Sequence, residues 1–273
     1  MDHLLVNRAA PHDLRTRRAR LLARIQRKYD TADDVLSIGP LRVPFTRVKD
    51  PDVVLDQLAE AADQRERETG ERIDLQHLPY WAELWDSAYG VAERLVARSN
   101  AWGLGDPKLV LDLGCGMGLT GTVAAQLRAS VMLADLEAEA LLFAQYNASQ
   151  TGDAHLVPRH ITGRHRRGLQ YRNYRRWVPR VRARQINWQT DHLGEQFDLI
   201  LGADILYDKT QWPFLDAFFR EHLAPGGVVI LGEPGRATGD LFVNWIVERN
   251  WSLDRIEVLV PTRGKPIRIF ELH

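Results

Sequence analysis

One glycine-rich stretch, Asp112-Leu-Gly-Cys-Gly-Met-Gly118, has a spacing suited to nucleotide chemistry. It follows an apolar run over 109–113 and opens a helical pattern over 118–128. Glycine permits sharp turns and close approach of a ligand to the backbone, and doubly wound folds bind nucleotides at a loop between a strand and a helix. The stretch therefore predicts a cofactor site that includes Asp112, Gly114, Cys115, Gly116 and Gly118.

The spacing of the glycines leaves the class of cofactor open. The GxGxxG frame of dinucleotide-binding loops fails from Gly114, whose sixth position is Leu119, but succeeds from Gly116 through Gly121. The glycines alone therefore do not exclude a dehydrogenase. Asp135 ends the next apolar run, nineteen residues after Gly116. A carboxylate there accepts both hydroxyls of a ribose, which suits either class of cofactor.

A second pair of chemically capable residues, Asp204 and Tyr207, follows the apolar run over 197–203. The carboxyl end of a parallel strand lies at the ligand-binding edge of such a sheet, where a carboxylate can orient an amine and an aromatic ring can surround a cation. The opposing interpretation is that Asp204 caps a turn and Tyr207 packs in the core. Cys115 has no His/Asn partner pattern, and the histidines lack metal-ligand spacing, so we expect no metal site.

These motifs carry a resemblance to a known family. The glycine loop and Asp135, followed by alternating strands and helices and a closing hairpin over 253–272, resemble the class I S-adenosylmethionine-dependent methyltransferases. A narrower resemblance, to the seven-β-strand protein lysine methyltransferases with a D-x-x-Y motif, rests on four segments. They are Trp81-Ala-Glu-Leu-Trp85, Asn187-Trp188, Asp204-Ile-Leu-Tyr207 and Gly232-Glu-Pro-Gly-Arg236, the last resembling the group that acts on the electron-transfer flavoprotein β-subunit.

The resemblance implies roles for individual residues. S-adenosylmethionine is the implied cofactor, with Trp85 and Ala203 near it and Trp188 covering the adenine. Asn187 stands where that group has an acid, but an amide oxygen can still contact the adenine amino group. Asp204 is implied to orient the acceptor amine and Tyr207 to shape its channel.

The implied function is a protein lysine N-methyltransferase. The alternatives are a small-molecule methyltransferase and an RNA-associated protein that binds S-adenosylmethionine. The chain lacks the [ND]-P-P-[YF] loop typical of enzymes that methylate adenine or glutamine amides, which argues against base methylation.

The elements that position these residues predict an α/β, Rossmann-like fold. We expect a mostly parallel seven-stranded sheet with a C-terminal antiparallel hairpin and helices on both faces. Residues 1–80 read as an N-terminal helical and hairpin extension, with a hairpin over 35–48 and a helix over 51–67. Residues 81–273 read as the methyltransferase domain, which begins with a helix over 85–97 capped by Asp86 or Ser87 and contains a basic insertion over about 151–181.

The charge balance of the chain conceals this insertion. Among 273 residues, 36 Lys and Arg offset 36 Asp and Glu, yet residues 154–190 contain ten Arg and no acid. The Arg-rich segment 159–184 fits an RNA-contacting arm, a contact for an acidic protein surface or a solvated loop. No secretory signal or membrane-spanning segment is evident. We expect a cytoplasmic protein, with mitochondrial targeting left open by the Arg-rich helical pattern over 15–28.

Overall fold

The computed structural model describes residues 11–70, 80–104, 108–150, 155–156, 180–260, 264 and 266–273. Its α-helices are α1 (Pro11–Gln26), α2 (Pro51–Thr69), α3 (Asp86–Arg98), α4 (Leu119–Gln126), α5 (Ala138–Ser149), α6 (Trp212–His222) and α7 (Ala237–Val247), with short 3-10 turns η2 (Tyr80–Ala82) and η3 (Lys209–Gln211). None of the described helices is long and apolar enough to span a membrane.

The strands form a hairpin and one large sheet. The hairpin pairs β1 (Thr31–Ile38) with β2 (Leu41–Val48). The sheet contains β3 (Leu109–Leu113), β4 (Ser130–Asp135), β5 (His155–Leu156), β6 (Arg180–Gln185), β7 (Phe197–Ala203), β8 (Leu223–Glu233), β9 (Leu253–Leu259) and β10 (Pro266–Leu272). Its spatial order is β5-β6-β4-β3-β7-β8-β10-β9, so the expected seven strands are joined by the two-residue β5 at one edge.

The sheet direction matches the expectation for the core. The six neighbouring strands β5, β6, β4, β3, β7 and β8 pair in parallel. Strand β10 pairs antiparallel with both β8 and β9. Strand order reverses beside β3, where the glycine loop leaves the sheet. Ligands of open α/β sheets bind at this point, beyond the carboxyl ends of the strands.

The apolar side chains of the central strands point alternately to the two faces of the sheet. On β3, Val110 belongs to a cluster with buried residues of α3, α4 and α5, whereas Leu111 and Leu113 belong to a cluster with α6 and α7. Helices therefore cover both faces, as the continuous apolar runs predicted.

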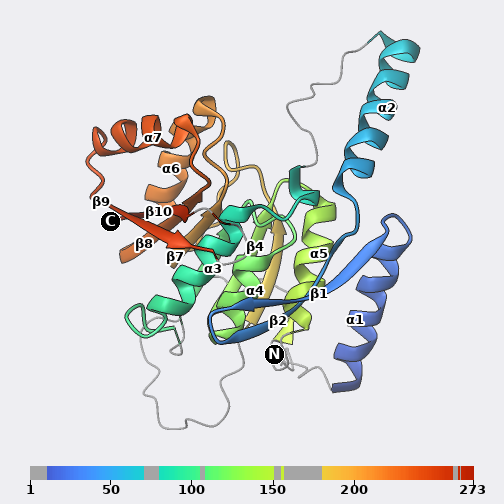
Figure 1. Cartoon of the computed structure of the whole chain (residues 1–273), viewed down its shortest axis with the longest axis horizontal. Coiled ribbons are helices and arrows are strands. Elements are labelled where there is room, and N and C mark those ends of the chain that lie inside the picture. The colour runs from blue at the N-terminus through green and yellow to red at the C-terminus, as the bar shows by residue number, and fades with distance from the viewer. Residues whose placement is uncertain are drawn as a thin grey trace, which may run out of the picture.

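The N-terminal extension packs against the core. Helix α1 lies alongside α5 (Figure 1) and buries Leu21 and Ile25 in the same cluster as the first layer of helices. The Asn147 side chain on α5 bonds both the backbone N–H and the carbonyl of Thr46 on β2, and also donates to the carbonyl of Met117 in the glycine loop. Helix α2, by contrast, projects away from the sheet (Figure 1).

The structure corrects two local expectations. Helix α3 begins after Trp85, which occupies the N-cap position without a side-chain cap bond, so neither Asp86 nor Ser87 caps the helix. The Ala-Pro-Gly-Gly composition of residues 224–227 predicts a turn, but these residues lie within β8, where the pairing with β7 shifts register between Phe197 and Leu199. The basic insertion lies outside the described residues, except for 155–156 and 180–181.

Candidate functional site

The glycine loop makes a sharp turn from β3 into α4. Gly114, Gly116 and Gly118 have φ values of 62°, 52° and 82°, in the left-handed region that glycine enters without a steric penalty. Gly118 also approaches α5 closely, because a Cβ placed there would lie 2.7 Å from the Cβ of Ala144. Both conformation and space therefore require glycine at position 118.

Asp135 lies directly beside this loop, as the sequence predicted. Its carboxylate accepts a hydrogen bond from the Gly116 N–H at 2.8 Å and another from the Glu137 N–H at 2.9 Å. Burial raises the pKa of Asp135 to about 6, against the lowering effect of these backbone bonds. A carboxylate offers about four lone-pair sites, so both oxygens keep acceptor capacity for the two hydroxyls of a ribose.

Asp112 and Cys115 support the loop from below. Asp112 is buried and accepts bonds from the Thr120 hydroxyl and the Gly121 N–H at the start of α4, and burial raises its pKa to about 7. The Cys115 N–H donates to the carbonyl of Ala134, and burial raises the pKa of the buried thiol well above its usual value. We therefore expect the Asp112 side chain and the Cys115 backbone to hold the loop in place.

Trp188 lies against the other side of the loop. A Cβ on Gly114 would lie 3.5 Å from the Trp188 ring, and the Trp188 indole N–H donates to Gln211 at 3.1 Å. The Asn187 side-chain oxygen accepts from the Gln189 N–H at 2.9 Å and so closes a turn. That oxygen retains one lone pair for the predicted adenine contact, which stays a prediction.

Trp85 lies in the pocket described below, and its expected place near the cofactor stays a prediction. Its indole N–H donates to the carbonyl of Tyr80 at 2.8 Å, and its ring faces Arg236 in that pocket. Trp81, four residues earlier, lies nearer the glycine loop, because a Cβ on Gly116 would lie 3.6 Å from the carbonyl oxygen of Trp81. Trp81 lies within the 3-10 turn η2, and its buried ring packs against Tyr29 and Phe143, whereas Trp85 follows this turn and lines the pocket.

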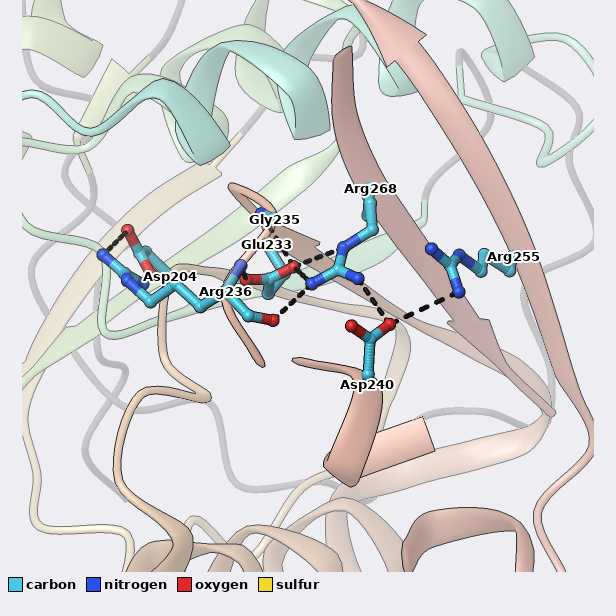
Figure 2. A network of polar contacts seen from close by, with 7 residues as sticks. All are labelled: Asp204, Glu233, Gly235, Arg236, Asp240, Arg255 and Arg268. Carbon is cyan, nitrogen blue, oxygen red and sulfur yellow. Dashed lines mark hydrogen bonds and ion pairs between the residues drawn. The ribbon is translucent and has the colours of Figure 1, made fainter. Parts of the chain in front are cut away.

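Asp204 follows Ala203, the last residue of β7, and takes up a left-handed conformation with φ of 60°. Its N–H donates to the carbonyl of Gly232 at the end of β8, so the turn is held on the neighbouring strand. Asp residues tolerate this conformation better than most non-glycine residues. The conformation directs the buried carboxylate toward Arg236 (Figure 2).

Arg236 holds Asp204 through two contacts. One guanidinium nitrogen bonds Oδ1 and the other bonds Oδ2 at 3.0 Å. Burial raises the pKa of the Asp204 carboxyl, and the hydrogen bond and positive charge of Arg236 oppose that rise. Arg236 also lies over the Trp85 ring, 5.8 Å from its centroid. No sequence motif assigns Arg236 a role, because Arg236 lies beyond β8 and meets Asp204 only in the fold.

Glu233 and Arg268 fix the loop that carries Arg236. The Glu233 carboxylate accepts from the N–H groups of Gly235 and Arg236 and from Arg268, which also donates to the Arg236 carbonyl and to Asp240 (Figure 2). Glu233 and Arg268 face each other in the antiparallel pairing of β8 and β10. This buried pair therefore supports the site from the C-terminal hairpin.

A pocket of about 470 Å³ opens over Asp204. Its walls come from the start of α2, from residues 80–86, and from the ends of β7 and β8. Tyr207 lies next to it, with its ring 5.9 Å from that of Tyr80. The lining side chains include four acids and two aromatic rings with Arg236: Asp52, Glu83, Asp86, Asp204, Tyr80, Trp85 and Arg236.

The pocket and the glycine loop are neighbours. Ile205, directly after Asp204, packs on the loop, since a Cβ on Gly114 would lie 2.9 Å from its side chain. Burial raises the pKa of the Tyr207 phenol, and the nearby Tyr80, Asp208, Asp135 and Asp204 groups add to the rise. Tyr207 is therefore close enough to feel the charges of both Asp135 and Asp204.

One group of potential metal ligands occurs in the described part of the chain. Asp254, Glu271 and His273 bring three ligand atoms within 4.8 Å of one another. Glu271 pairs with Arg94, and its register partner on β8 is Ile230 rather than the residues near Glu233. This group is therefore separate from the glycine loop and the pocket.

Comparisons with known proteins agree with this architecture. The family model for the methyltransferase small domain matches residues 99–165. The chain is 35% identical over 127 residues to the protein N-lysine methyltransferase METTL21A of Danio rerio, covering 45% of this chain and 48% of the relative. It is 30% identical over 160 residues to the ribosomal protein L11 methyltransferase of Rhodopseudomonas palustris, covering 54% and 46%. The chain thus spans about half the length of the curated relatives that it matches.

Solved structures with a similar arrangement include two methyltransferases. The N-methyltransferase NodS of Bradyrhizobium japonicum, in complex with S-adenosylhomocysteine, aligns with a TM-score of 0.46 and 17% identity over 66% of this chain and 86% of that one. The ribosomal protein L11 methylase of Lactobacillus delbrueckii aligns with a TM-score of 0.43 and 19% identity over 66% and 78%. The glycine loop lies inside the stretch that the methyltransferase family model matches, and the strand order is that of a Rossmann-like α/β fold.

Proposed function

We propose that this chain is an S-adenosylmethionine-dependent methyltransferase whose acceptor is the side-chain amine of a protein lysine. The observation that carries the acceptor class is the pocket over Asp204. A buried carboxylate, three further acids and two aromatic rings suit a cationic side chain on a narrow aliphatic stem. The curated relatives, which include a lysine methyltransferase and a ribosomal protein methyltransferase, support a protein acceptor.

The residues present fit the cofactor. Three left-handed glycines leave the loop without side chains, Asp135 presents acceptor oxygens beside it, and the Trp188 ring lies against Gly114. S-adenosylmethionine, when bound, supplies a methyl group on a positively charged sulfur. We assign the ribose to Asp135, the adenine face to Trp188 and the close backbone approach to Gly114 and Gly116.

The pocket residues prepare the acceptor for methyl transfer. A lysine amine has a pKa of about 10.4 and attacks only after it loses its proton. Asp204 orients the amine through its carboxylate. The rings of Trp85, Tyr80 and Tyr207 surround the amine nitrogen, which would gain positive charge on methylation. The bound cofactor would supply the methyl group for an in-line displacement, and the pocket residues would contribute by holding the deprotonated amine in position.

A radiolabel assay tests the function. The chain is incubated with tritiated S-adenosylmethionine and lysate divided into untreated, protease-treated and RNase-treated portions and a small-metabolite fraction. We expect label in protein that is lost with protease and retained with RNase. Label confined to the metabolite fraction would instead identify a small-molecule methyltransferase, and loss with RNase would identify an RNA acceptor.

Two matched variants test the acceptor assignment. Asp204→Asn should retain binding of S-adenosylmethionine and lose at least tenfold in turnover, because the carboxylate that orients the amine is gone. Asp208→Asn alters a half-buried N-cap four residues away, whose side chain accepts from Thr210, and should retain turnover. Equal turnover in the two variants would contradict the role of Asp204.

A further inference from the structure

We propose that Arg236 occupies the position of the acceptor's cation and thereby sets the specificity of the pocket, so that a substrate lysine enters by displacing it from Asp204. This inference rests on the proposed function. It assigns to Arg236 a selective role that the motifs did not indicate.

The guanidinium already makes the contacts that an acceptor ammonium needs. It bonds both carboxylate oxygens of Asp204 and lies 5.8 Å from the centroid of the Trp85 ring. Carboxylate oxygens and an aromatic face are the two kinds of group that stabilise a bound cation. The Asp204 carboxylate therefore already holds a cation, which a side chain of the protein supplies.

The two partners differ in their freedom to move. The Asp204 side chain is 5% exposed, whereas the Arg236 side chain is 38% exposed. The Arg236 backbone is fixed, because its N–H donates to Glu233 and its carbonyl accepts from Arg268 (Figure 2). The side chain of Arg236 is therefore the part that can leave toward solvent without disturbing the loop or Asp204.

The pocket wall favours exchange of one cation for another. Asp52, Glu83 and Asp86 line the pocket together with Asp204, so an approaching ammonium is attracted. Exchange leaves Asp204 paired throughout. A neutral side chain that displaced Arg236 would leave a buried carboxylate without its partner, which is strongly destabilising. Arg236 thus admits cations and opposes uncharged groups of similar shape.

Binding of a small lysine mimic tests the exchange directly. The probe is Nα-acetyl-lysine methylamide, with the norleucine analogue as its uncharged counterpart, titrated by ligand-observed NMR with and without S-adenosylhomocysteine. Arg236→Met removes the competing charge and retains an unbranched stem over Trp85. We expect this variant to bind the lysine mimic about tenfold more tightly than the unmodified chain, the lower end of what a charge-assisted hydrogen bond contributes.

Further variants separate exchange from general effects. Arg236→Lys keeps a competing cation and should bind the mimic within about threefold of the unmodified chain. Arg236→Gln also removes the charge but adds no apolar group. It should bind the lysine mimic as tightly as is expected of Arg236→Met, and it replaces Arg236→Met in the test if that variant folds poorly. Arg255→Met is the matched control, because Arg255 is an exposed arginine of the same network that pairs with Asp240 outside the pocket lining; it should change nothing.

The outcomes are distinct. Weaker or unchanged binding of the lysine mimic by both Arg236→Met and Arg236→Gln would overturn the inference and show that Arg236 stays in place to position Asp204. Tighter binding of the norleucine analogue to the same extent would also overturn it, because the gain would then be apolar. Failure of the proposed function would appear separately, as absent binding of S-adenosylhomocysteine and absent methyl transfer by the unmodified chain.

Discussion

Replacing Asp135 by asparagine tests how the loop and the cofactor are joined. The carboxylate of Asp135 accepts from the Gly116 and Glu137 N–H groups and is assigned to the two ribose hydroxyls. Charge-assisted hydrogen bonds are roughly twice as strong as neutral ones, which amounts to about 1 kcal/mol for each ribose bond. Two such bonds give about 2 kcal/mol, or a roughly 30-fold weaker affinity for S-adenosylmethionine.

The fold should tolerate this change better than the cofactor site does. Asparagine loses one acceptor for a backbone N–H, but it also removes a buried charge whose desolvation raises the pKa of Asp135 to about 6. These two effects on the free energy of unfolding oppose each other. Thermal unfolding without cofactor should therefore change far less than the affinity does.

Calorimetry at pH 8 with S-adenosylmethionine measures the effect, and Asp198→Asn is the matched control. The Asp198 carboxylate also accepts a hydrogen bond from a backbone N–H, that of Leu109. This bond lies at the amino-terminal ends of β3 and β7, away from the glycine loop. It should bind the cofactor like the unmodified chain. The reasoning is refuted if Asp135→Asn binds within threefold of the unmodified chain, or if Asp198→Asn loses as much affinity.

Three further predictions follow from the loop. Gly118→Ala should destabilise the fold by about 2–5 kcal/mol, through the strain of the left-handed conformation and the clash with Ala144. Gly70 has a similar φ but open space around it, so Gly70→Ala should show the strain alone. Equal losses of stability in denaturant unfolding would contradict this account. Because the pKa of Asp135 is about 6, its carboxylate is ionised above that pH. Affinity for S-adenosylmethionine should therefore fall as the pH drops from 7 to 5, a decline that Asp135→Asn should lack in the same titration. Cys115 is buried with a raised thiol pKa, so iodoacetamide at pH 8 should modify it only in denaturant; rapid labelling of the native chain, read by mass spectrometry, would argue against that burial.

Local sequence signals predicted the elements of the core well. Leu109–Leu113 is an apolar run followed at once by glycines, and it forms β3 with those bounds. Asp135 ends the next strand, and its contact with Gly116 follows from the parallel pairing of β3 and β4. These features are legible because a strand, its turn and its neighbour in a parallel sheet are close in sequence.

The acceptor pocket was less predictable, because its contacts join distant segments. Asp204 and Arg236 are separated by the whole of α6 and β8, and their ion pair depends on how two strands end. Trp81 and Trp85 are both aromatic residues before α3, but only the fold shows that the Trp81 ring packs in the core while the Trp85 ring lies in the pocket. Sequence spacing identifies such candidates without revealing which partner each one meets.

The closing antiparallel hairpin supports the pocket over Asp204. Strand β10 lies between β8 and β9, and this order sets Arg268 opposite Glu233 at the end of β8. A buried carboxylate is tolerated there because Arg268 neutralises it, and the pair then holds both backbone groups of Arg236. The last strands of the chain therefore fix the backbone position of Arg236. In the proposed exchange, only the Arg236 side chain moves away from Asp204.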